Sequence, residues 1–299
     1  MKAALSDKHP QTAIIPLRDG RNIGAALYGT TSFRSPILYF HGFPGSRLEI
    51  SIADSVAREL DITLIALDRP GVGNSTPCKG RALTDWPNDV EQAALHFNLE
   101  SFDLLAVSGG APYALACAAS RLAPKLKGVT IVSGLSPIGW RESRLGMAAP
   151  YRLLFFLARN IRPAARAVLY AAACVTALYP KLWQEFLKLS LSEADRRVLS
   201  DAKASLMLAR NLKEAQKHGV SPLLQDFSLL TSSWGFEPGS IAAPVHFWHG
   251  CSDRMLPHKG AEKLRSLICG AQLTLLKGEG HFMAIERHRE ILLSIVQRP

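Results

Sequence analysis

The fold of this 299-residue chain is decided by the stretch Leu104-Leu105-Ala106-Val107-Ser108-Gly109-Gly110-Ala111-Pro112-Tyr113-Ala114-Leu115-Ala116. Residues 102–107 have the length and apolar composition of a buried strand, and an alanine-rich, helix-forming run follows the two glycines. Pro112 suits the first turn of that helix, where a missing N–H does no harm. The order strand, serine, glycines and helix is typical of a nucleophile elbow, a tight turn that lifts a serine above a sheet. A small-residue turn in an ordinary strand–helix unit fits as well, since Ala106 replaces the first glycine of the usual G-x-S-x-G.

The composition is that of an ordinary globular protein, with 47% hydrophobic and 20% charged residues. At this length the chain can bury a sizeable core. The formal net charge of +10 would attract nucleic acid, anionic lipid or an acidic partner. The chain has no run of lysines and arginines and no nucleic-acid recognition motif, so we expect no nucleic-acid partner.

The cysteines and the apolar runs indicate where the protein works. The five cysteines are widely spaced and include no C-x-x-C pair, which argues for reduced thiols rather than disulfides or a zinc site. Residues 1–8 lack the apolar core of a secretory signal. The longest uncharged apolar stretch, residues 167–179, is shorter than the roughly 17–25 residues of a membrane-spanning helix. We therefore expect a soluble, cytoplasmic protein.

Strand and helix patterns alternate over the first 136 residues. Apolar runs predict strands at residues 12–17, 22–28, 36–40, 62–67, 102–107 and 128–133, with helices at 46–60 and 86–97. Ser46 and Glu49 have the spacing of a capping box, which would begin the first of these helices. Alternation of this kind predicts a parallel sheet with helices on both faces.

The pattern changes after residue 136. Helices alone are predicted at residues 151–160, 164–178, 182–189, 193–217 and 223–231, in a segment with 14 lysines and arginines against 8 acidic residues. Strands return at 245–248 and 273–276, with helices at 259–268 and 286–296. We predict an α/β fold with a mostly parallel sheet of about eight strands. Residues 1–136 and 241–299 form the core, and residues 137–240 form a helical cap.

Ser108 requires two partners to act as a nucleophile. A serine hydroxyl needs an imidazole to accept its proton and a carboxylate to orient that imidazole. His281 follows the last predicted strand in a glycine-flanked loop, and Asp253 follows the strand before it. Because functional sites in parallel sheets lie at the carboxyl ends of the strands, we expect the three side chains to meet.

Five segments, in this order, resemble the successive signatures of the α/β-hydrolase superfamily, and most closely its capped serine-hydrolase branch. They are His41-Gly42-Phe43-Pro44-Gly45-Ser46, Asp68-Arg69-Pro70-Gly71-x-Gly73-x-Ser75, the elbow at Ser108, His249-Gly250-x-x-Asp253 and Gly280-His281. The resemblance extends from about residue 12 to the C-terminus and is weakest across the cap. It implies a catalytic triad of Ser108, Asp253 and His281. It also implies an oxyanion hole formed by the backbone N–H groups of Phe43 and Gly109.

Other polar residues near these motifs have simpler interpretations. Asp68 is the rival carboxylate, but its place before Arg69 and a Pro-Gly pair indicates a turn-forming role. His41 is expected to brace the oxyanion loop. His246 and His249, three residues apart on a strand, point to opposite faces and are poorly placed to share a metal. We expect no metal and no cofactor.

A serine at the elbow predicts an acyl-serine intermediate that a water activated by His281 hydrolyses. We favour an ester, thioester or lactone of a small to medium apolar acyl substrate. An aminopeptidase, a C–C bond hydrolase, an acyltransferase and a non-catalytic ligand-binding relative stay open. The basic, apolar stretch 151–182 could also contact an anionic membrane, although a cap packed onto its own core is the favoured interpretation. The oligomeric state does not follow from the sequence.

Overall fold

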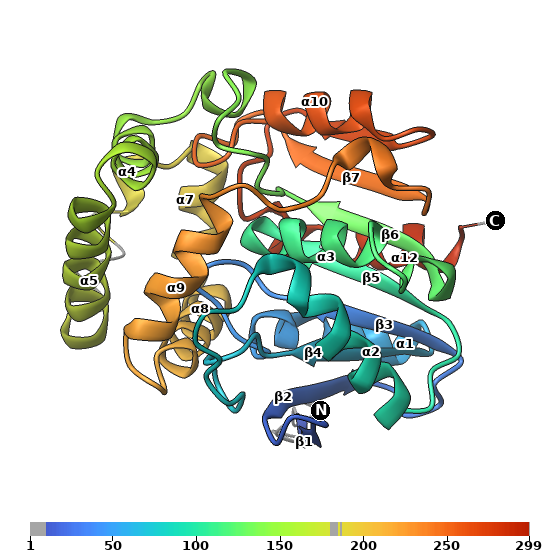
Figure 1. Ribbon diagram of the computed structural model, residues 1–299. Coiled ribbons are helices and arrows are strands. Elements are labelled where there is room, and N and C mark those ends of the chain that lie inside the picture. Colours follow the sequence, from blue (N-terminus) through green and yellow to red (C-terminus); the bar gives the residue numbers. More distant parts are fainter. Residues whose placement is uncertain (1–9, 180–184, 186, 299) are drawn as a thin grey trace, which may run out of the picture.

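The computed structural model describes residues 10–179, 185 and 187–298. Its centre is an eight-stranded sheet with the strand order β1-β2-β4-β3-β5-β6-β7-β8 (Figure 1). The strands are β1 (Gln11–Pro16), β2 (Asn22–Gly29), β3 (Ser35–Phe40), β4 (Ile62–Leu67), β5 (Phe102–Val107), β6 (Leu126–Val132), β7 (Val245–Gly250) and β8 (Gln272–Leu276). β1 and β2 are antiparallel to their neighbours, and the other six strands are parallel. The predicted α/β fold is confirmed.

Helices cover both faces of the sheet because successive strand residues point to opposite sides. Leu38, Phe40 and Leu104 pack with α2 (Trp86–His96), α3 (Ala111–Ala118) and α10 (Lys259–Leu267). Tyr39 and Leu105, one residue out of phase, pack on the other face with α1 (Asp54–Glu59) and α12 (His288–Val296). The central strands are therefore continuous apolar runs, as expected for strands that are buried on both sides.

Within the described residues, five helices follow one another between β6 and β7. They are α4 (Ala149–Asn160), α5 (Arg162–Leu178), α7 (Glu193–Ser200), α8 (Ala202–Ala215) and α9 (Ser221–Leu230). In Figure 1 they stand to the left of the sheet, beside the carboxyl ends of the parallel strands. Their positions fall within the predicted cap. Short 3₁₀ helices complete the fold: η1 (Glu49–Ala53), η2 (Leu83–Asp85), η3 (Ser108–Gly110), η4 (Ala123–Lys125), η5 (Glu142–Arg144) and η6 (Pro238–Ser240).

Two helix boundaries differ from the prediction, and a cap explains the first difference. The helix expected from residue 193 to 217 is two helices, because the Asp201 carboxylate caps α8 by accepting the Ala204 N–H at 2.8 Å. The helix expected at 286–296 is α12, which begins at His288, and the short helix α11 (Met283–Glu286) precedes it. The helix expected at 182–189 falls largely outside the described residues.

The predicted capping box of Ser46 and Glu49 is wrong. The Ser46 hydroxyl donates instead to Oδ1 of Asn211, on α8, at 2.8 Å. The Glu49 carboxylate accepts the backbone N–H of Gly42, so neither side chain caps the helix. Regular helix therefore begins later than expected, with η1 at Glu49 and α1 at Asp54. Within the described residues, no helix is both long enough and apolar enough to cross a membrane.

Candidate active site

The elbow forms as a sharp turn between β5 and α3. Ser108 has a φ of +51°, in the left-handed region that is strained for a residue with a side chain. Gly110 allows the turn because a side-chain carbon at this position would lie 2.3 Å from the carbonyl oxygen of Phe40. Ala106 is buried within β5 and pairs with Phe40 of β3. The turn is therefore compatible with an alanine in place of the first glycine.

Ser108, His281 and Asp253 come together at the carboxyl ends of β5, β8 and β7. Nε2 of His281 is 3.1 Å from Oγ of Ser108, and its Nδ1 is 2.8 Å from Oδ2 of Asp253. All three residues are buried, with at most 9% of their surface exposed. With the proton on Nδ1 donated to Asp253, Nε2 can accept the hydroxyl proton of Ser108.

Gly250, at the end of β7, brings the acid and histidine loops together. A side-chain carbon at Gly250 would lie 2.4 Å from the carbonyl oxygen of Glu279, immediately before the Gly280-His281 pair. Two backbone donors hold the carboxylate of Asp253: its Oδ1 accepts hydrogen bonds from the N–H groups of Met255 and Leu256 at 2.8 and 2.9 Å. The orientation of this carboxylate is thus fixed by the backbone.

His249 also contacts the acid, a contact that the sequence did not reveal. Its Nε2 lies 3.2 Å from Oδ2 of Asp253 and 2.6 Å from the carbonyl oxygen of Leu256. Burial by itself would raise the pKa of Asp253, but His281 and His249 hold the pKa well below its usual range. The carboxylate is therefore charged at neutral pH.

The pKa of His281 lies above that of an ordinary histidine. Burial works in the opposite direction and would lower the pKa by itself. The charge and hydrogen bond of Asp253 outweigh burial, with further contributions from Asp195 and Glu49. The carboxylates around the ring therefore favour its protonated, imidazolium form.

Two backbone N–H groups meet beside Ser108. The Phe43 N–H has no acceptor among the described residues. Gly109 lies in η3, at the N-terminal end of the elbow helix, where N–H groups lack intrahelical partners. A side-chain carbon on Gly109 would lie only 3.1 Å from the Phe43 nitrogen, so the two groups are neighbours. This pair can donate to a negatively charged oxygen that forms next to Ser108.

His41 and Arg69 hold the loop that carries Phe43. Nδ1 of His41 is 2.9 Å from the carbonyl oxygen of Gly42, and its Nε2 accepts the Arg69 N–H at 3.3 Å. Burial, helped by the positive charge of Arg69, keeps the pKa of His41 well below its usual value, so the ring is neutral. The Arg69 guanidinium donates to the carbonyl oxygens of His41 and Gly42 at 2.5 and 2.9 Å. These contacts agree with a bracing role for His41.

Glu49 is a further acid at the site, and its predicted capping role is wrong. Its Oε2 accepts the Gly42 N–H at 2.6 Å and the Tyr39 hydroxyl at 2.7 Å. A side-chain carbon on Gly42 would lie 3.4 Å from Cβ of Ser108 and 3.0 Å from Oε1 of Glu49, so the acid lies behind the loop that carries Phe43 and close to the elbow. Burial raises the pKa of Glu49 despite these two donors. Glu49 therefore fixes the peptide that precedes Phe43.

Two acids of the cap reach into the core. Asp195, on α7, accepts the N–H of Phe282 at 2.8 Å, next to His281. Asp226, on α9, pairs with Arg69 at 2.9 Å and with Arg81 at 2.8 Å. Burial by itself would raise the pKa of Asp226, but these two arginines hold the pKa well below its usual range. Asp195 lies in the first turn of α7, whose N-cap is Ser192, and this local position gives no sign of its contact with Phe282.

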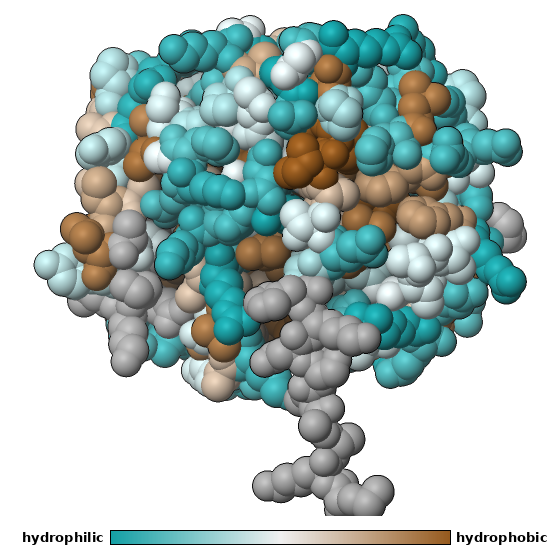
Figure 2. Space-filling model, turned by 90° about the horizontal axis from the view of Figure 1, so that it is seen from below, coloured by the Kyte–Doolittle hydropathy of each residue, from teal (hydrophilic) through white to brown (hydrophobic). Residues whose placement is uncertain are grey.

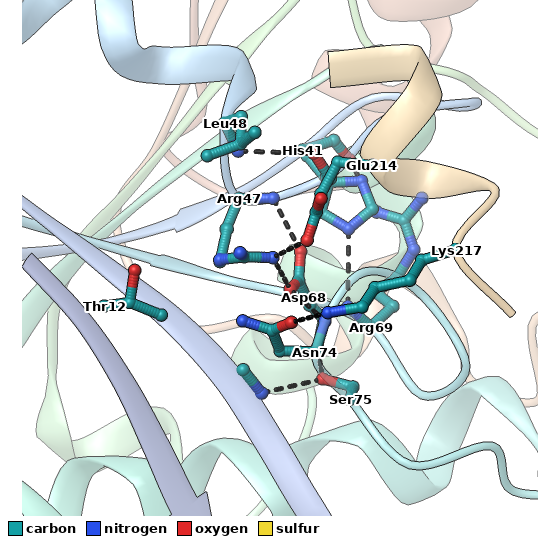
Figure 3. Close-up of polar contacts among 12 residues, drawn as sticks. Thr12, His41, Arg47, Leu48, Asp68, Arg69, Asn74, Ser75, Glu214 and Lys217 are labelled. Atoms are coloured by element: carbon teal, nitrogen blue, oxygen red, sulfur yellow. Dashed lines mark hydrogen bonds and ion pairs between the residues drawn. The ribbon is translucent and has the colours of Figure 1, made fainter. Parts of the chain in front are cut away.

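The helix α8 is attached to the core through the charged cluster that Figure 3 shows. Nη1 of Arg47 lies 2.6 Å from Asp68 and 2.7 Å from Glu214 of α8. Asp68 also accepts the Asn74 N–H at 2.9 Å, which fixes the predicted turn, and Lys217 donates to the side chain of Asn74. Asp68 therefore binds the Asn74 turn and Arg47, and the carboxylate that contacts His281 is that of Asp253.

The described residues contain no group of three or more His, Cys, Asp or Glu side chains that could hold a metal ion. The two histidines of β7 have separate contacts. His246 bonds with Thr274 at 2.8 Å, whereas His249 faces the Asp253 loop.

Comparisons with known proteins agree with this architecture. The model of the family described as alpha/beta hydrolase fold matches residues 35–288. A comparison with curated proteins gives no match. Among solved structures, an esterase from Exiguobacterium antarcticum is 18% identical with a TM-score of 0.72, and a bromoperoxidase from Bacillus anthracis is 19% identical with a TM-score of 0.71. An enol-lactonase from Burkholderia xenovorans LB400 is 14% identical with a TM-score of 0.67. Each comparison covers 96% of this chain and 100% of the other, and at these identities the likeness is one of fold.

Proposed function

Because the chain belongs to the alpha/beta hydrolase fold family, we propose that it is a serine hydrolase that cleaves a carboxylic ester, thioester or lactone. One observation carries the proposal. A hydrogen-bonded row runs from Ser108 through His281 to Asp253, beside the N–H groups of Phe43 and Gly109. Nucleophile, base, orienting acid and oxyanion donors are then all within reach of one carbonyl group.

In the acylation step, Oγ of Ser108 attacks the carbonyl carbon while its proton passes to Nε2 of His281. The charge of Asp253 stabilises the imidazolium. The carbonyl oxygen becomes an oxyanion and accepts hydrogen bonds from Phe43 and Gly109, each worth about 2.7–4 kcal/mol in a measured serine enzyme. His281 then protonates the leaving alcohol or thiol as the tetrahedral intermediate collapses to the acyl-serine.

In the deacylation step, His281 removes a proton from a water that attacks the acyl-serine. The second tetrahedral intermediate uses the same two N–H donors. Its collapse breaks the bond to Ser108, which regains a proton from His281, and the carboxylic acid leaves. Water is the only co-reactant.

Aromatic and aliphatic side chains of the cap favour an apolar acyl group. Phe227 of α9 packs on Phe43 with ring centroids 5.6 Å apart, and Phe155 of α4 stacks on Phe227 at 6.1 Å. Leu230 reaches to 3.3 Å of a side-chain carbon placed on Gly109. An acyl chain that leaves the oxyanion donors toward the cap would meet this apolar surface.

A fluorophosphonate probe and a substrate panel test the proposal. The wild type should be labelled and Ser108→Ala should not, while the matched exposed variant Ser240→Ala should be labelled like the wild type. p-Nitrophenyl esters of increasing acyl length should be hydrolysed, and aminoacyl naphthylamides should not. Labelling of Ser108→Ala as strong as that of the wild type would refute the assignment of the nucleophile.

The same panel separates the remaining activities. Turnover of naphthylamides without turnover of any ester would identify an aminopeptidase. Transfer of the acyl group to an added alcohol in preference to water would identify an acyltransferase. Cleavage of a β-diketone without ester turnover would identify a C–C bond hydrolase, and absence of both labelling and turnover would leave a ligand-binding protein.

A further inference from the structure

The outer face of the helical hairpin formed by α4 and α5 carries an unusual number of exposed apolar side chains. Six of them are between 47% and 71% exposed: Leu153, Phe156, Ile161, Val168, Tyr170 and Leu178. In Figure 1, α5 forms the left edge of the molecule, and Figure 2 shows separate brown and tan patches along the same edge, with pale and teal surface between them. An exposed hairpin that carries this many apolar side chains is a candidate contact site.

The charge of this hairpin has a single sign. No acidic residue occurs between Glu142 and Glu185. Arg152, Arg162 and Arg166 are exposed, and their side chains make no hydrogen bond or ion pair with any described residue. The outer face therefore combines apolar side chains with positive charges that have no partner within the described chain.

The inner face of the hairpin is already used. Ala158 of α4 and Ala165 of α5 are buried against Phe227 of α9. Phe155 stacks on the same ring, which in turn contacts Phe43 beside Ser108. Core packing therefore accounts for the inner side chains, and among the described residues the outer ones have no such packing partner.

We propose that the outer face of the α4–α5 hairpin docks onto a bilayer that contains anionic lipid. The apolar side chains enter the interface, and Arg152, Arg162 and Arg166 bind the headgroup phosphates, as is typical of basic amphipathic helices. A second copy of the chain fits less well. A two-fold contact through this face would bring arginines together with no acidic residue of the hairpin between them.

Docking in this orientation has a consequence for access to the site. The opposite face of the same hairpin contacts Phe227, which packs on Phe43, so the membrane would lie directly across the hairpin from Ser108. The hairpin would then stand between the bilayer and the loop that carries Phe43. The docking itself does not depend on the proposed hydrolase activity and is measured without a substrate.

Vesicle flotation of the full-length protein tests the docking. At low salt, the wild type should float with vesicles of equal parts phosphatidylglycerol and phosphatidylcholine, and it should not float with phosphatidylcholine alone. The triple variant R152Q/R162Q/R166Q should bind roughly 100-fold more weakly, since each cation contributes about fivefold. The double variant L153S/F156S should lose binding by at least about tenfold.

The control removes the same formal charge from three arginines at the amino ends of the strands, each of which pairs with a carboxylate. Arg34, Arg58 and Arg121 are exposed and precede strands β3, β4 and β6. R34Q/R58Q/R121Q should float like the wild type. Equal losses for the two triple variants would overturn the proposal, because net charge alone would then explain binding.

Two other results would also overturn it. One is absence of flotation on anionic vesicles at low salt. The other is a concentration-dependent dimer, seen by sedimentation, that L153S/F156S abolishes, because a second copy would then cover the face. Unchanged fluorophosphonate labelling of the hairpin variants in the absence of lipid shows that they are folded. Failure of labelling in the wild type would count against the hydrolase and would leave the docking result standing.

Discussion

Arg69 and Asp226 form a fully buried ion pair that joins the loop after β4 to the cap helix α9. Nη2 of Arg69 lies 2.9 Å from Oδ2 of Asp226, and neither side chain is more than 1% exposed. The same guanidinium donates to the carbonyl oxygens of His41 and Gly42. Asp226, a residue of the cap, therefore positions Arg69, which in turn supports the loop that carries Phe43.

Loss of the Asp226 charge should destabilise the protein strongly. In Asp226→Asn, the cations of Arg69 and Arg81 stay buried without a full counter-charge, so we expect a loss of about 3–5 kcal/mol in the free energy of unfolding. Chemical denaturation measures it. The control, Glu91→Gln, removes an exposed ion pair with Arg121 and should cost under about 1 kcal/mol. Similar losses in both variants would contradict the role of Asp226.

Glu49 should act on the rate through the oxyanion loop. Glu49→Ala removes the acceptor of the Gly42 N–H, so the adjoining Phe43 N–H loses its position and kcat should fall by about 10²–10³-fold with a smaller change in KM. Glu49→Gln keeps an oxygen acceptor and should lose much less. Steady-state kinetics with a p-nitrophenyl ester distinguish the two. If both variants lost stability and kept the wild-type kcat, Glu49 would be purely structural.

The sheet could be read from the sequence because its signals are local. β4 and β5 have the predicted bounds, since a strand that is buried on both faces is a short apolar run between turn residues. The meeting of Ser108, Asp253 and His281 followed from a general rule about the carboxyl ends of parallel strands. No knowledge of the cap was needed for either.

The supporting acids could not be found in this way because their partners are distant in sequence. Asp226 binds an arginine 157 positions away, and Asp195 binds a backbone N–H 87 positions away. Glu49 has the spacing of a capping residue, but the buried Gly42 N–H is its actual partner. Local spacing predicts local bonds, and tertiary contacts replace them wherever a buried donor would otherwise lack an acceptor.

The pH dependence should follow His281. Its imidazole must be neutral to accept the proton of Ser108, and its pKa is raised above the ordinary value of about 6.5. We therefore expect kcat/KM to rise with pH through a midpoint above that value. The free energy of unfolding depends on pH in the opposite direction. The stabilisation that the protonated His281 ring contributes is complete below its unfolded-state pKa, and it is lost as pH rises through its folded-state pKa. A midpoint below 6.5 in a pH–rate profile would contradict the assignment.

Asp195 should shift this midpoint from the cap. Asp195→Asn keeps an oxygen for the Phe282 N–H but removes a negative charge that raises the pKa of His281, so the midpoint should move to lower pH. Asp195→Ala also removes the hydrogen bond and should lower kcat at every pH. Glu193→Gln, an exposed change on the same helix, is the control. Coincident profiles for Asp195→Asn and the wild type would show that Asp195 has no electrostatic role.

Gly109→Ala should disable the oxyanion hole while the nucleophile stays in place. The new methyl group would lie 2.7 Å from Cβ of Phe43, a distance that real contacts do not reach, so the loop must move away from the elbow. Displacement of the Phe43 N–H should lower kcat by about 10²–10³-fold. Gly239→Ala is the matched control, because its methyl group would meet nothing closer than 3.6 Å. The kinetics of both variants are measured on one ester, with unfolding curves to confirm that each is folded. A Gly109→Ala enzyme with the wild-type kcat would place the oxyanion donors elsewhere.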